Sequence, residues 1–185
     1  MMKSALILID IQNDYFPGGS NELYQAEEAG ARAQKVLDFY RRNKMPLFFI
    51  QHINDYPAAP FFRQDSKGAG IHPCVAPRGD ESIIVKHAPS SFYKTVLLEE
   101  LKKLDITHLV IVGMMSHMCV DTTVRAARDL DFTVTVLEDA CTTCDMNWRN
   151  IVIPAKTLHT AFMGSLSQYF ADVIGTEQYL SDTKI

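Results

Sequence analysis

Short apolar segments alternate along this chain with longer segments of helical periodicity. Six apolar segments are predicted to be strands: 4–10, 46–53, 82–86, 108–113, 132–139 and 171–175. Four segments with apolar residues at helical spacing are predicted to be helices: 22–43, 95–104, 119–130 and 154–170. This alternation favours an α/β fold with a parallel sheet covered by helices. We expect one domain spanning residues 1–185, with a short tail after the last strand.

Charge and hydropathy exclude several classes of partner. The net charge is −4, and no cluster of Lys and Arg is present, which argues against nucleic-acid binding. The longest apolar runs have the length of strands, far short of the roughly 20 residues that span a membrane. Asp10 interrupts the apolar stretch near the N-terminus, which argues against a signal peptide. We therefore expect a cytoplasmic protein with reduced cysteines and a small-molecule substrate.

Residues 54–81 are rich in Pro, Gly and Asp and have no apolar periodicity. A loop of this length inside a compact domain is usually functional. We expect it to form a lid or a binding loop.

Three chemically active side chains follow predicted strands. Asp10 ends the first strand, Lys86 ends the third, and Cys119 follows the fourth at the predicted start of a helix. Ligands of open parallel sheets bind outside the carboxyl ends of the strands, so these three side chains are expected to meet there. Each alone has a plainer role, as a turn cap, a solvated strand end or a buried packing residue. Together they favour a catalytic site.

A cysteine at a helix start is suited to nucleophilic catalysis. The helix N-terminus and the nearby Lys86 would favour the thiolate, so we expect the pKa of Cys119 to be lowered. Asp10 could take the thiol proton and later return it to a leaving group. Backbone N–H groups at the same place could hold an oxyanion.

The segments that carry these residues resemble the isochorismatase-like cysteine hydrolase superfamily. They are LILIDIQNDYF with Asp10, IIVKHAPSSF with Lys86 and VIVGMMSHMCVDTTVRAA with Cys119, and the resemblance extends over nearly the whole chain. It implies a Rossmann-like, doubly wound sheet of six parallel strands with helices on both faces. It also implies an Asp10–Lys86–Cys119 triad. A cis peptide between Met114 and Met115 is implied as well, which aims the Met115 N–H, with that of Cys119, into an oxyanion hole.

The branches of this family differ in chemistry. True isochorismatases lack the cysteine nucleophile, so Cys119 argues against cleavage of a vinyl ether. Nicotinamidases carry an Asp-x-His pair where this chain has His52-Ile53-Asn54. His52 and His72 without that acid make a poor metal site, so no metal or other cofactor is expected.

What remains is an amidohydrolase that cleaves a small amide, ureido or lactam C–N bond through a thioester. The stretch GMMSHMC is similar to that of streptothricin-type hydrolases. The resemblance also implies a homo-oligomer of two or more chains. Two alternatives stay open: a metal-assisted nicotinamidase, and a catalytically idle member used for binding or assembly.

The remaining candidates have a plain structural alternative. Gln12, Phe16 and Phe92 follow the predicted strands and could line the substrate pocket, or they could cap a turn and pack in the core. The C-x-x-C stretch at 141–144 has no second pair for zinc and lies in no thioredoxin-like unit, so a redox role is disfavoured. Cys141 could nevertheless border the pocket.

Overall fold

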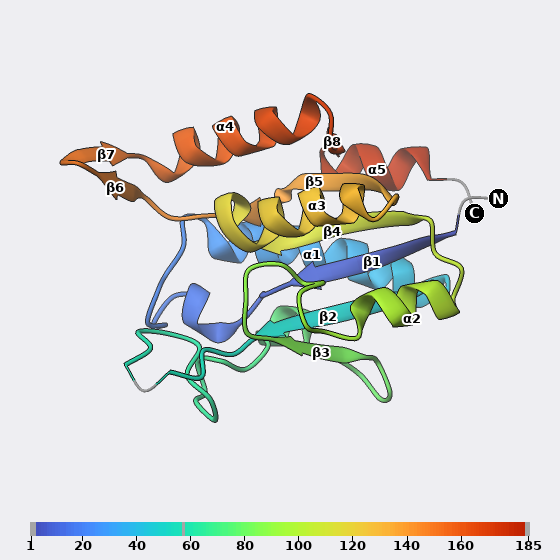
Figure 1. Ribbon diagram of the computed structural model, residues 1–185, viewed down its shortest axis with the longest axis horizontal. Coiled ribbons are helices and arrows are strands. Elements are labelled where there is room, and N and C mark those ends of the chain that lie inside the picture. The colour runs from blue at the N-terminus through green and yellow to red at the C-terminus, as the bar shows by residue number, and fades with distance from the viewer. Residues whose placement is uncertain (1–2, 57, 184–185) are drawn as a thin grey trace.

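Six parallel strands form the centre of the protein, in the order β3-β2-β1-β4-β5-β8 (Figure 1). The computed structural model describes residues 3–56 and 58–183. The strands are β1 (Ser4–Ile9), β2 (Leu47–His52), β3 (Ile83–Lys86), β4 (His108–Met114), β5 (Thr133–Thr142) and β8 (Asp172–Ile174). The order runs outward from β1 on one side and from β4 on the other, so the topological switch point lies between these two strands. The predicted doubly wound sheet is confirmed.

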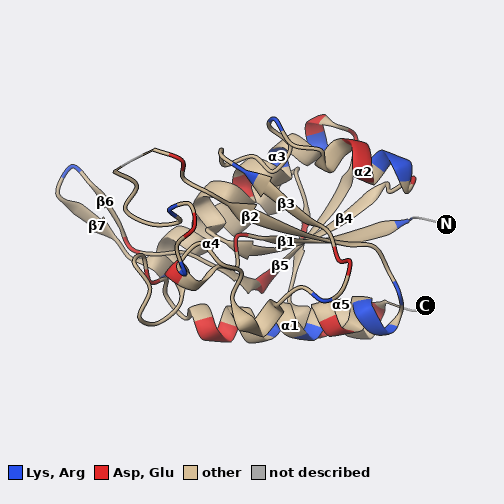
Figure 2. Ribbon diagram, turned by 90° about the horizontal axis from the view of Figure 1, so that it is seen from below, with Lys and Arg blue, Asp and Glu red and all other residues tan. Residues whose placement is uncertain are grey.

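Helices cover both faces of the sheet (Figure 2). Helices α1 (Ala26–Arg42) and α5 (Thr176–Asp182) lie on one face, and α2 (Leu97–Lys103), α3 (Asp121–Asp129) and α4 (Ala155–Ser167) lie on the other. Strand β1 shows why its sequence is continuously apolar: Leu6 and Leu8 pack in the core under α1, whereas Ile7 and Ile9 pack in the core under α2 and α3. Burial of each such side chain contributes about 1.5–3 kcal/mol to folding.

The end of β4 lies unusually close to β1 because residue 113 is glycine. Gly113 has a φ of +133°, and a Cβ there would lie 2.0 Å from the carbonyl oxygen of Ile9. Only glycine combines this backbone conformation with this approach. One residue further along the chain, the peptide bond between Met114 and Met115 is cis.

A π-helical turn, Ser116–Val120, separates β4 from α3. The prediction that the helix begins at Cys119 is therefore wrong, because α3 begins at Asp121 and Cys119 lies in the turn before it. Ser116 fastens this turn to α4, since its Oγ lies 2.7 Å from Nδ1 of His159.

Two elements near the C-terminus were not predicted. Residues after 175 form α5 rather than a tail, and the Tyr179 hydroxyl of this helix lies 2.8 Å from that of Tyr40 in the core. A hairpin of β6 (Met146–Trp148) and β7 (Ile151–Ile153) projects beyond the sheet (Figure 1). Both segments are short, and their stability depends on distant contacts or on a tight turn, which apolar periodicity does not reveal.

The long loop packs against the carboxyl edge of the sheet. It includes the 3-10 turn Pro73–Val75, and Pro57 lies outside the described residues. The Asp14 carboxylate accepts a hydrogen bond from the N–H of Phe62 at 2.7 Å, and the side-chain amide of Gln12 donates to the carbonyl of Ala69 at 2.7 Å. These bonds hold the loop over the strand ends where the candidate site lies. Within the ranges that the structure describes, no helix has the length and hydropathy to cross a bilayer.

Candidate active site

Asp10 and Lys86 form a buried ion pair at the carboxyl edge of the sheet. Nζ of Lys86 lies 2.8 Å from Oδ2 of Asp10, and both side chains are 0% exposed. Asp10 directly follows β1, and its N–H donates to the carbonyl of Ile50 in β2 at 3.1 Å. Lys86 is the last residue of β3, on the other side of β2. The parallel arrangement thus brings together two residues 76 positions apart in sequence, as predicted from the strand ends.

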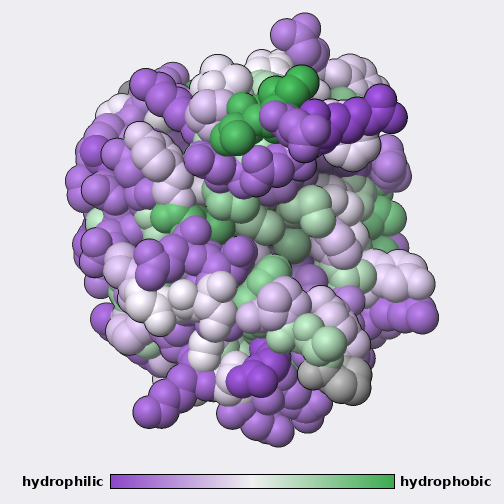
Figure 3. Space-filling model, turned by 90° about the vertical axis from the view of Figure 1, so that its left-hand side faces the viewer, coloured by the Kyte–Doolittle hydropathy of each residue, from purple (hydrophilic) through white to green (hydrophobic). Residues whose placement is uncertain are grey.

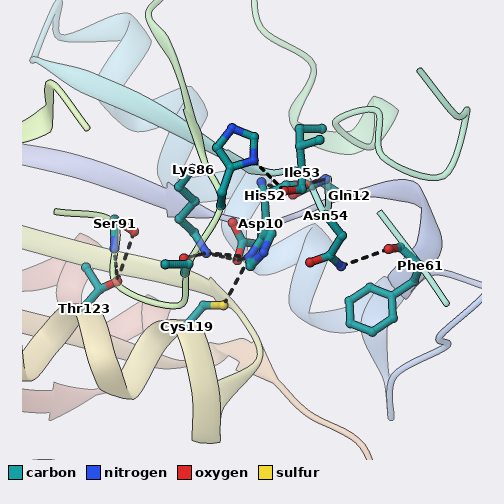
Figure 4. A network of polar contacts seen from close by, with 12 residues as sticks. Asp10, Gln12, His52, Ile53, Asn54, Phe61, Lys86, Ser91, Cys119 and Thr123 are labelled. Carbon is teal, nitrogen blue, oxygen red and sulfur yellow. Dashed lines mark hydrogen bonds and ion pairs between the residues drawn. The ribbon is translucent and has the colours of Figure 1, made fainter. Parts of the chain in front are cut away.

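His52 joins this pair from the strand between them (Figure 4). It is the cross-strand partner of Lys86 in the β2–β3 register, and its Nδ1 lies 2.9 Å from Nζ of Lys86. The same ring nitrogen lies 3.8 Å from Oδ2 of Asp10. His52 was considered only as a metal ligand from sequence. Its position at the end of a central strand, opposite Lys86, is the signal that could have identified it.

Cys119 completes the cluster from the turn after β4. Its Sγ lies 3.9 Å from Nδ1 of His52, and the ligand atoms of Asp10, His52 and Cys119 all lie within 4.8 Å of one another. The residue is 5% exposed. Since Asp10 and Cys119 follow β1 and β4, they flank the switch point of the sheet, where ligands of such folds bind. In Figure 4 a dashed line joins the sulfur to the His52 ring, next to the carboxylate of Asp10 and the ammonium of Lys86.

The ion pair keeps both of its members charged. Burial by itself would raise the pKa of Asp10, but the Lys86 ammonium is the largest opposing cause, and the pKa of Asp10 lies below its usual value. Burial would also lower the pKa of Lys86, but Asp10 and Cys119 raise it above the usual value. Asp10 is therefore a carboxylate and Lys86 an ammonium at neutral pH.

The thiol of Cys119 has a raised pKa, so the expectation of a lowered one is wrong. Burial is the largest cause, and the negative charge of Asp10 adds to it, whereas Lys86 acts in the opposite direction. The resting cluster consequently holds a thiol beside a carboxylate, which is an arrangement for proton transfer rather than a preformed thiolate.

Neither carboxylate oxygen of Asp10 has a hydrogen-bond donor among the described residues, and both are buried. Oδ2 faces the Lys86 ammonium in an ion pair at 2.8 Å, whereas Oδ1 has no such partner among those residues. A buried polar atom without a partner is costly unless a ligand or a reacting group supplies one. This oxygen is therefore available to accept a proton at the centre of the cluster.

The predicted pocket residues have different surroundings. The side-chain amide of Gln12 hydrogen-bonds to main-chain atoms, with Nε2 donating to the carbonyls of His52 and Ala69 and Oε1 accepting from the N–H of His52. Phe92 stacks on Phe132, with ring centroids 6.0 Å apart, against the core under α2 and α3. Phe16 stacks on His72 at 3.5 Å.

Some of the predicted pocket residues line cavities on this part of the molecule. Phe16 and His72 line one of about 460 Å³, between residues 13–20 and the long loop. Cys141 lines another of about 460 Å³, next to His159 and Tyr24. Neither is lined by Asp10, Lys86 or Cys119. Figure 3 faces this end of the molecule, where apolar residues gather in the centre between polar ones.

The cluster does not suit a metal ion, although Asp10, His52 and Cys119 are close enough together to be considered as ligands. Nζ of Lys86 lies 2.8 Å from the Asp10 carboxylate and 2.9 Å from Nδ1 of His52. The ammonium therefore engages the oxygen and the nitrogen that a cation would need, and it adds a positive charge beside them. His72 lies apart from this group, stacked on Phe16, with its Nδ1 accepting from the N–H of Cys74 at 3.3 Å.

Comparison with known proteins finds strong similarity along almost the whole chain. The sequence profile of the isochorismatase domain matches residues 4–178. YddQ of Bacillus subtilis, an uncharacterized isochorismatase family protein, is 42% identical over 179 residues, which are 97% of this chain and 99% of that protein. A crystal structure of a candidate isochorismatase hydrolase from Oleispira antarctica is 40% identical in sequence and has a TM-score of 0.93. The match covers 97% of this chain and 96% of that protein.

More distant relatives carry names that specify an activity. Streptothricin hydrolase of Streptomyces noursei is 29% identical over 147 residues, which are 77% of this chain but 50% of that protein. Nicotinamidase 3 of Arabidopsis thaliana is 24% identical over 187 residues, covering 95% of this chain and 86% of that protein.

Proposed function

The chain belongs to the isochorismatase family of hydrolases, and on that premise we propose that it is a cysteine-dependent amidohydrolase with catalytic residues Asp10, Lys86 and Cys119. The observation that carries the proposal is the buried Asp10–Lys86 ion pair beside a nearly buried thiol. A charged pair is costly to bury and persists where function requires it. The names of two distant relatives, a streptothricin hydrolase and a nicotinamidase, support a small amide or lactam as the substrate class.

The first half of the reaction forms a thioester. Asp10 accepts the proton of Cys119 while Sγ bonds to the carbonyl carbon of the amide. The negative charge that develops on the carbonyl oxygen is held by the backbone N–H groups of Met115 and Cys119. When the C–N bond breaks, Asp10 returns its proton to the nitrogen, which leaves as ammonia or an amine.

The second half releases the enzyme. Asp10, again a carboxylate, takes a proton from water while the water oxygen bonds to the thioester carbon. The C–S bond breaks, the acid product leaves, and the proton on Asp10 returns to the sulfur. One water is consumed, and the enzyme regains its starting state.

Lys86 stabilises charge at each stage. In the resting state its ammonium faces the Asp10 carboxylate. As the proton moves to Asp10, negative charge builds on the sulfur before the new C–S bond passes it to the carbonyl oxygen, and the same ammonium can stabilise this charge in a low-dielectric site. Because the cluster keeps its total charge, the transfer requires no counterion from solvent.

Substrate access requires movement of side chains over the cluster, because Cys119 is 5% exposed. We place Gln12, Phe16 and Phe92 around the route. Gln12 anchors the main chain of His52, Phe16 forms a wall of one cavity, and Phe92 follows the Lys86 strand. The long loop, tied to Asp14 and Gln12, forms the rim.

The experiment is a screen for ammonia release over small primary amides, carbamoyl amino acids and lactams, with ring opening followed for the lactams. Cys119→Ser is the inactive control, and Cys74→Ser is the matched control at a cysteine outside the cluster. We expect turnover of at least one class that Cys119→Ser abolishes and Cys74→Ser preserves. A catalytically idle binding member would turn over none of them. A nicotinamidase that uses a metal would hydrolyse nicotinamide and lose this activity to a chelator.

Self-association and a cytoplasmic location belong to the same proposal. The β6–β7 hairpin exposes Trp148, Ile151 and Val152 at 62%, 62% and 58%, and a second copy of the chain is the partner that the family resemblance predicts for them. The four cysteines are free thiols, which is the state that a reducing compartment maintains.

A further inference from the structure

We propose that His52 is a positioning residue, which holds the Lys86 ammonium in place and leaves Asp10 as the only base for the Cys119 thiol. The inference rests on the proposed function, because it assigns a role within the same cluster. It adds a fourth residue that acts through Lys86 rather than on the substrate.

Lys86 has two hydrogen-bond acceptors and one ion-pair partner. Nζ hydrogen-bonds Nδ1 of His52 at 2.9 Å and the carbonyl oxygen of Ala88 at 3.1 Å, and it lies 2.8 Å from Oδ2 of Asp10 in the ion pair. An ammonium carries three N–H groups, and His52 is the only side chain of these two acceptors, so its loss leaves one N–H without that partner. Lys86 is 1% exposed, and an N–H that loses its acceptor there would stay unpaired.

The contact with Lys86 determines which nitrogen of the His52 ring carries the proton. Lys86 is an ammonium, since its pKa is raised, and an ammonium can only donate. Nδ1 of His52 must therefore accept, which assigns the ring proton to Nε2.

The Cys119 sulfur competes for the same ring nitrogen. Nδ1 has one lone pair, and the Lys86 bond at 2.9 Å engages it. The contact of Cys119 Sγ with this nitrogen is longer, at 3.9 Å, so the ring is the weaker acceptor for the thiol proton. The thiol proton is directed to the Asp10 carboxylate instead, where Oδ1 has no other donor among the described residues.

Gln12 holds the main chain of His52 in place. Its N–H donates to Oε1 of Gln12 at 2.7 Å, and its carbonyl accepts from Nε2 of Gln12 at 2.9 Å. The side-chain amide of Gln12 thus hydrogen-bonds to both main-chain polar groups of His52. The β2–β3 register places its ring opposite Lys86. This gives Gln12 a role in holding the cluster through the main chain of His52.

The test uses iodoacetamide as the probe and follows alkylation of Cys119 by peptide mass spectrometry at neutral pH. It therefore needs no known substrate. His52→Leu removes the acceptor, whereas His52→Asn keeps an acceptor on the same branch of the side chain. His87→Leu is the matched control, because this neighbouring histidine contacts the carbonyl of Ile53 and not Nζ of Lys86. Alkylation of the half-buried Cys74 serves as the internal reference for global unfolding.

We expect His52→Leu to slow alkylation of Cys119 by roughly 10-fold to 100-fold, the range expected when a hydrogen bond to a charged group is lost. His52→Asn and His87→Leu should stay within about threefold of the unmodified protein, a margin below the effect of one hydrogen bond to a charge. In a Lys86→Met background, His52→Leu should cause no further change, because the histidine acts through the lysine.

Three results would overturn the inference. They are an unchanged rate of Cys119 alkylation in His52→Leu, a loss of this rate in His52→Asn as large as in His52→Leu, or a loss caused by His52→Leu in the Lys86→Met background as large as in the native background. A purely structural role for His52 would give the last of these. Should His52→Leu fail to fold, His52→Asn decides alone, since a large loss in a folded variant that keeps the acceptor contradicts the proposal. None of these outcomes depends on turnover, so failure of the amidohydrolase proposal is detected separately by the Cys119→Ser assay.

Discussion

Nζ of Lys86 lies 2.8 Å from Oδ2 of Asp10, and neither side chain contacts solvent. The stability of the fold does not explain this pair, since the desolvation cost of burying two charges usually exceeds the free energy that their attraction returns. Its position between β1 and β3, beside a thiol that follows β4, gives it a chemical reason. The pair keeps a base charged within reach of a sulfur whose pKa the burial has raised.

The first prediction concerns removal of one partner of the pair. Lys86→Met leaves a buried carboxylate without its counter-charge, so we expect a loss of about 3–5 kcal/mol in the free energy of unfolding. The double variant Asp10→Leu with Lys86→Met removes both charges and should be the more stable of the two. Urea unfolding of both variants measures this. A single variant as stable as the double one would show that the pair is not coupled.

The second prediction concerns stability against pH. The pKa of Asp10 is lowered in the folded state, so its contribution is present above the unfolded value of about 3.9 and is lost as pH falls through the folded value. The pKa of Lys86 is raised, so its contribution is present below about 10.4 and is lost as pH rises through the folded value.

We therefore expect the uncharged double variant to lose less stability than the native chain at both extremes of pH. Thermal unfolding across the pH range checks this. Parallel pH curves for the two proteins would contradict the assigned shifts.

The third prediction concerns the thiol. The Asp10 carboxylate raises the pKa of Cys119, so Asp10→Asn should lower it and move the midpoint of alkylation to a lower pH. The same variant should abolish turnover, because it lacks the base. An unchanged midpoint would mean that burial alone sets the pKa of this thiol.

The fourth prediction concerns Gly113. A φ of +133° and a Cβ that would lie 2.0 Å from the Ile9 carbonyl oxygen make alanine incompatible with this backbone. We expect Gly113→Ala to destabilise the fold by at least about 1–3 kcal/mol and to displace the turn that carries Cys119. The matched control is Gly164→Ala, at an exposed position of α4 where an added Cβ would have no atom within 4 Å. We expect this change to raise the free energy of unfolding by about 0.5–1 kcal/mol. Equal effects at both sites would contradict the close approach of β4 to β1.

The fifth prediction concerns self-association. Replacement of both Trp148 and Ile151 by serine should lower the molar mass measured by light scattering, because these exposed side chains are the proposed contact. Tyr93→Ser, at another exposed aromatic residue, is the control and should leave the mass unchanged. A monomeric native chain would refute the assembly.

The sheet and the meeting of Asp10 with Lys86 could be predicted from sequence for one reason. Parallel strands end at a common edge, so residues that end two such strands converge whatever their separation along the chain. Helix α5 could not be predicted, because it is short and its Tyr179 is held by a distant partner, Tyr40. The raised pKa of Cys119 also could not be predicted, since it depends on how deeply the thiol is buried and on how close Asp10 lies to it. His52 was visible but unassigned until its register with Lys86 was known.

The most direct test of the account is the intact mass of the protein quenched during turnover of an amide found in the screen. We predict a fraction of the enzyme heavier by the acyl part of the substrate, with the added mass on the peptide that contains Cys119 and absent from Cys119→Ser. Turnover of the same amide at the native rate by Cys119→Ser, or an added mass on any other residue, would contradict the account.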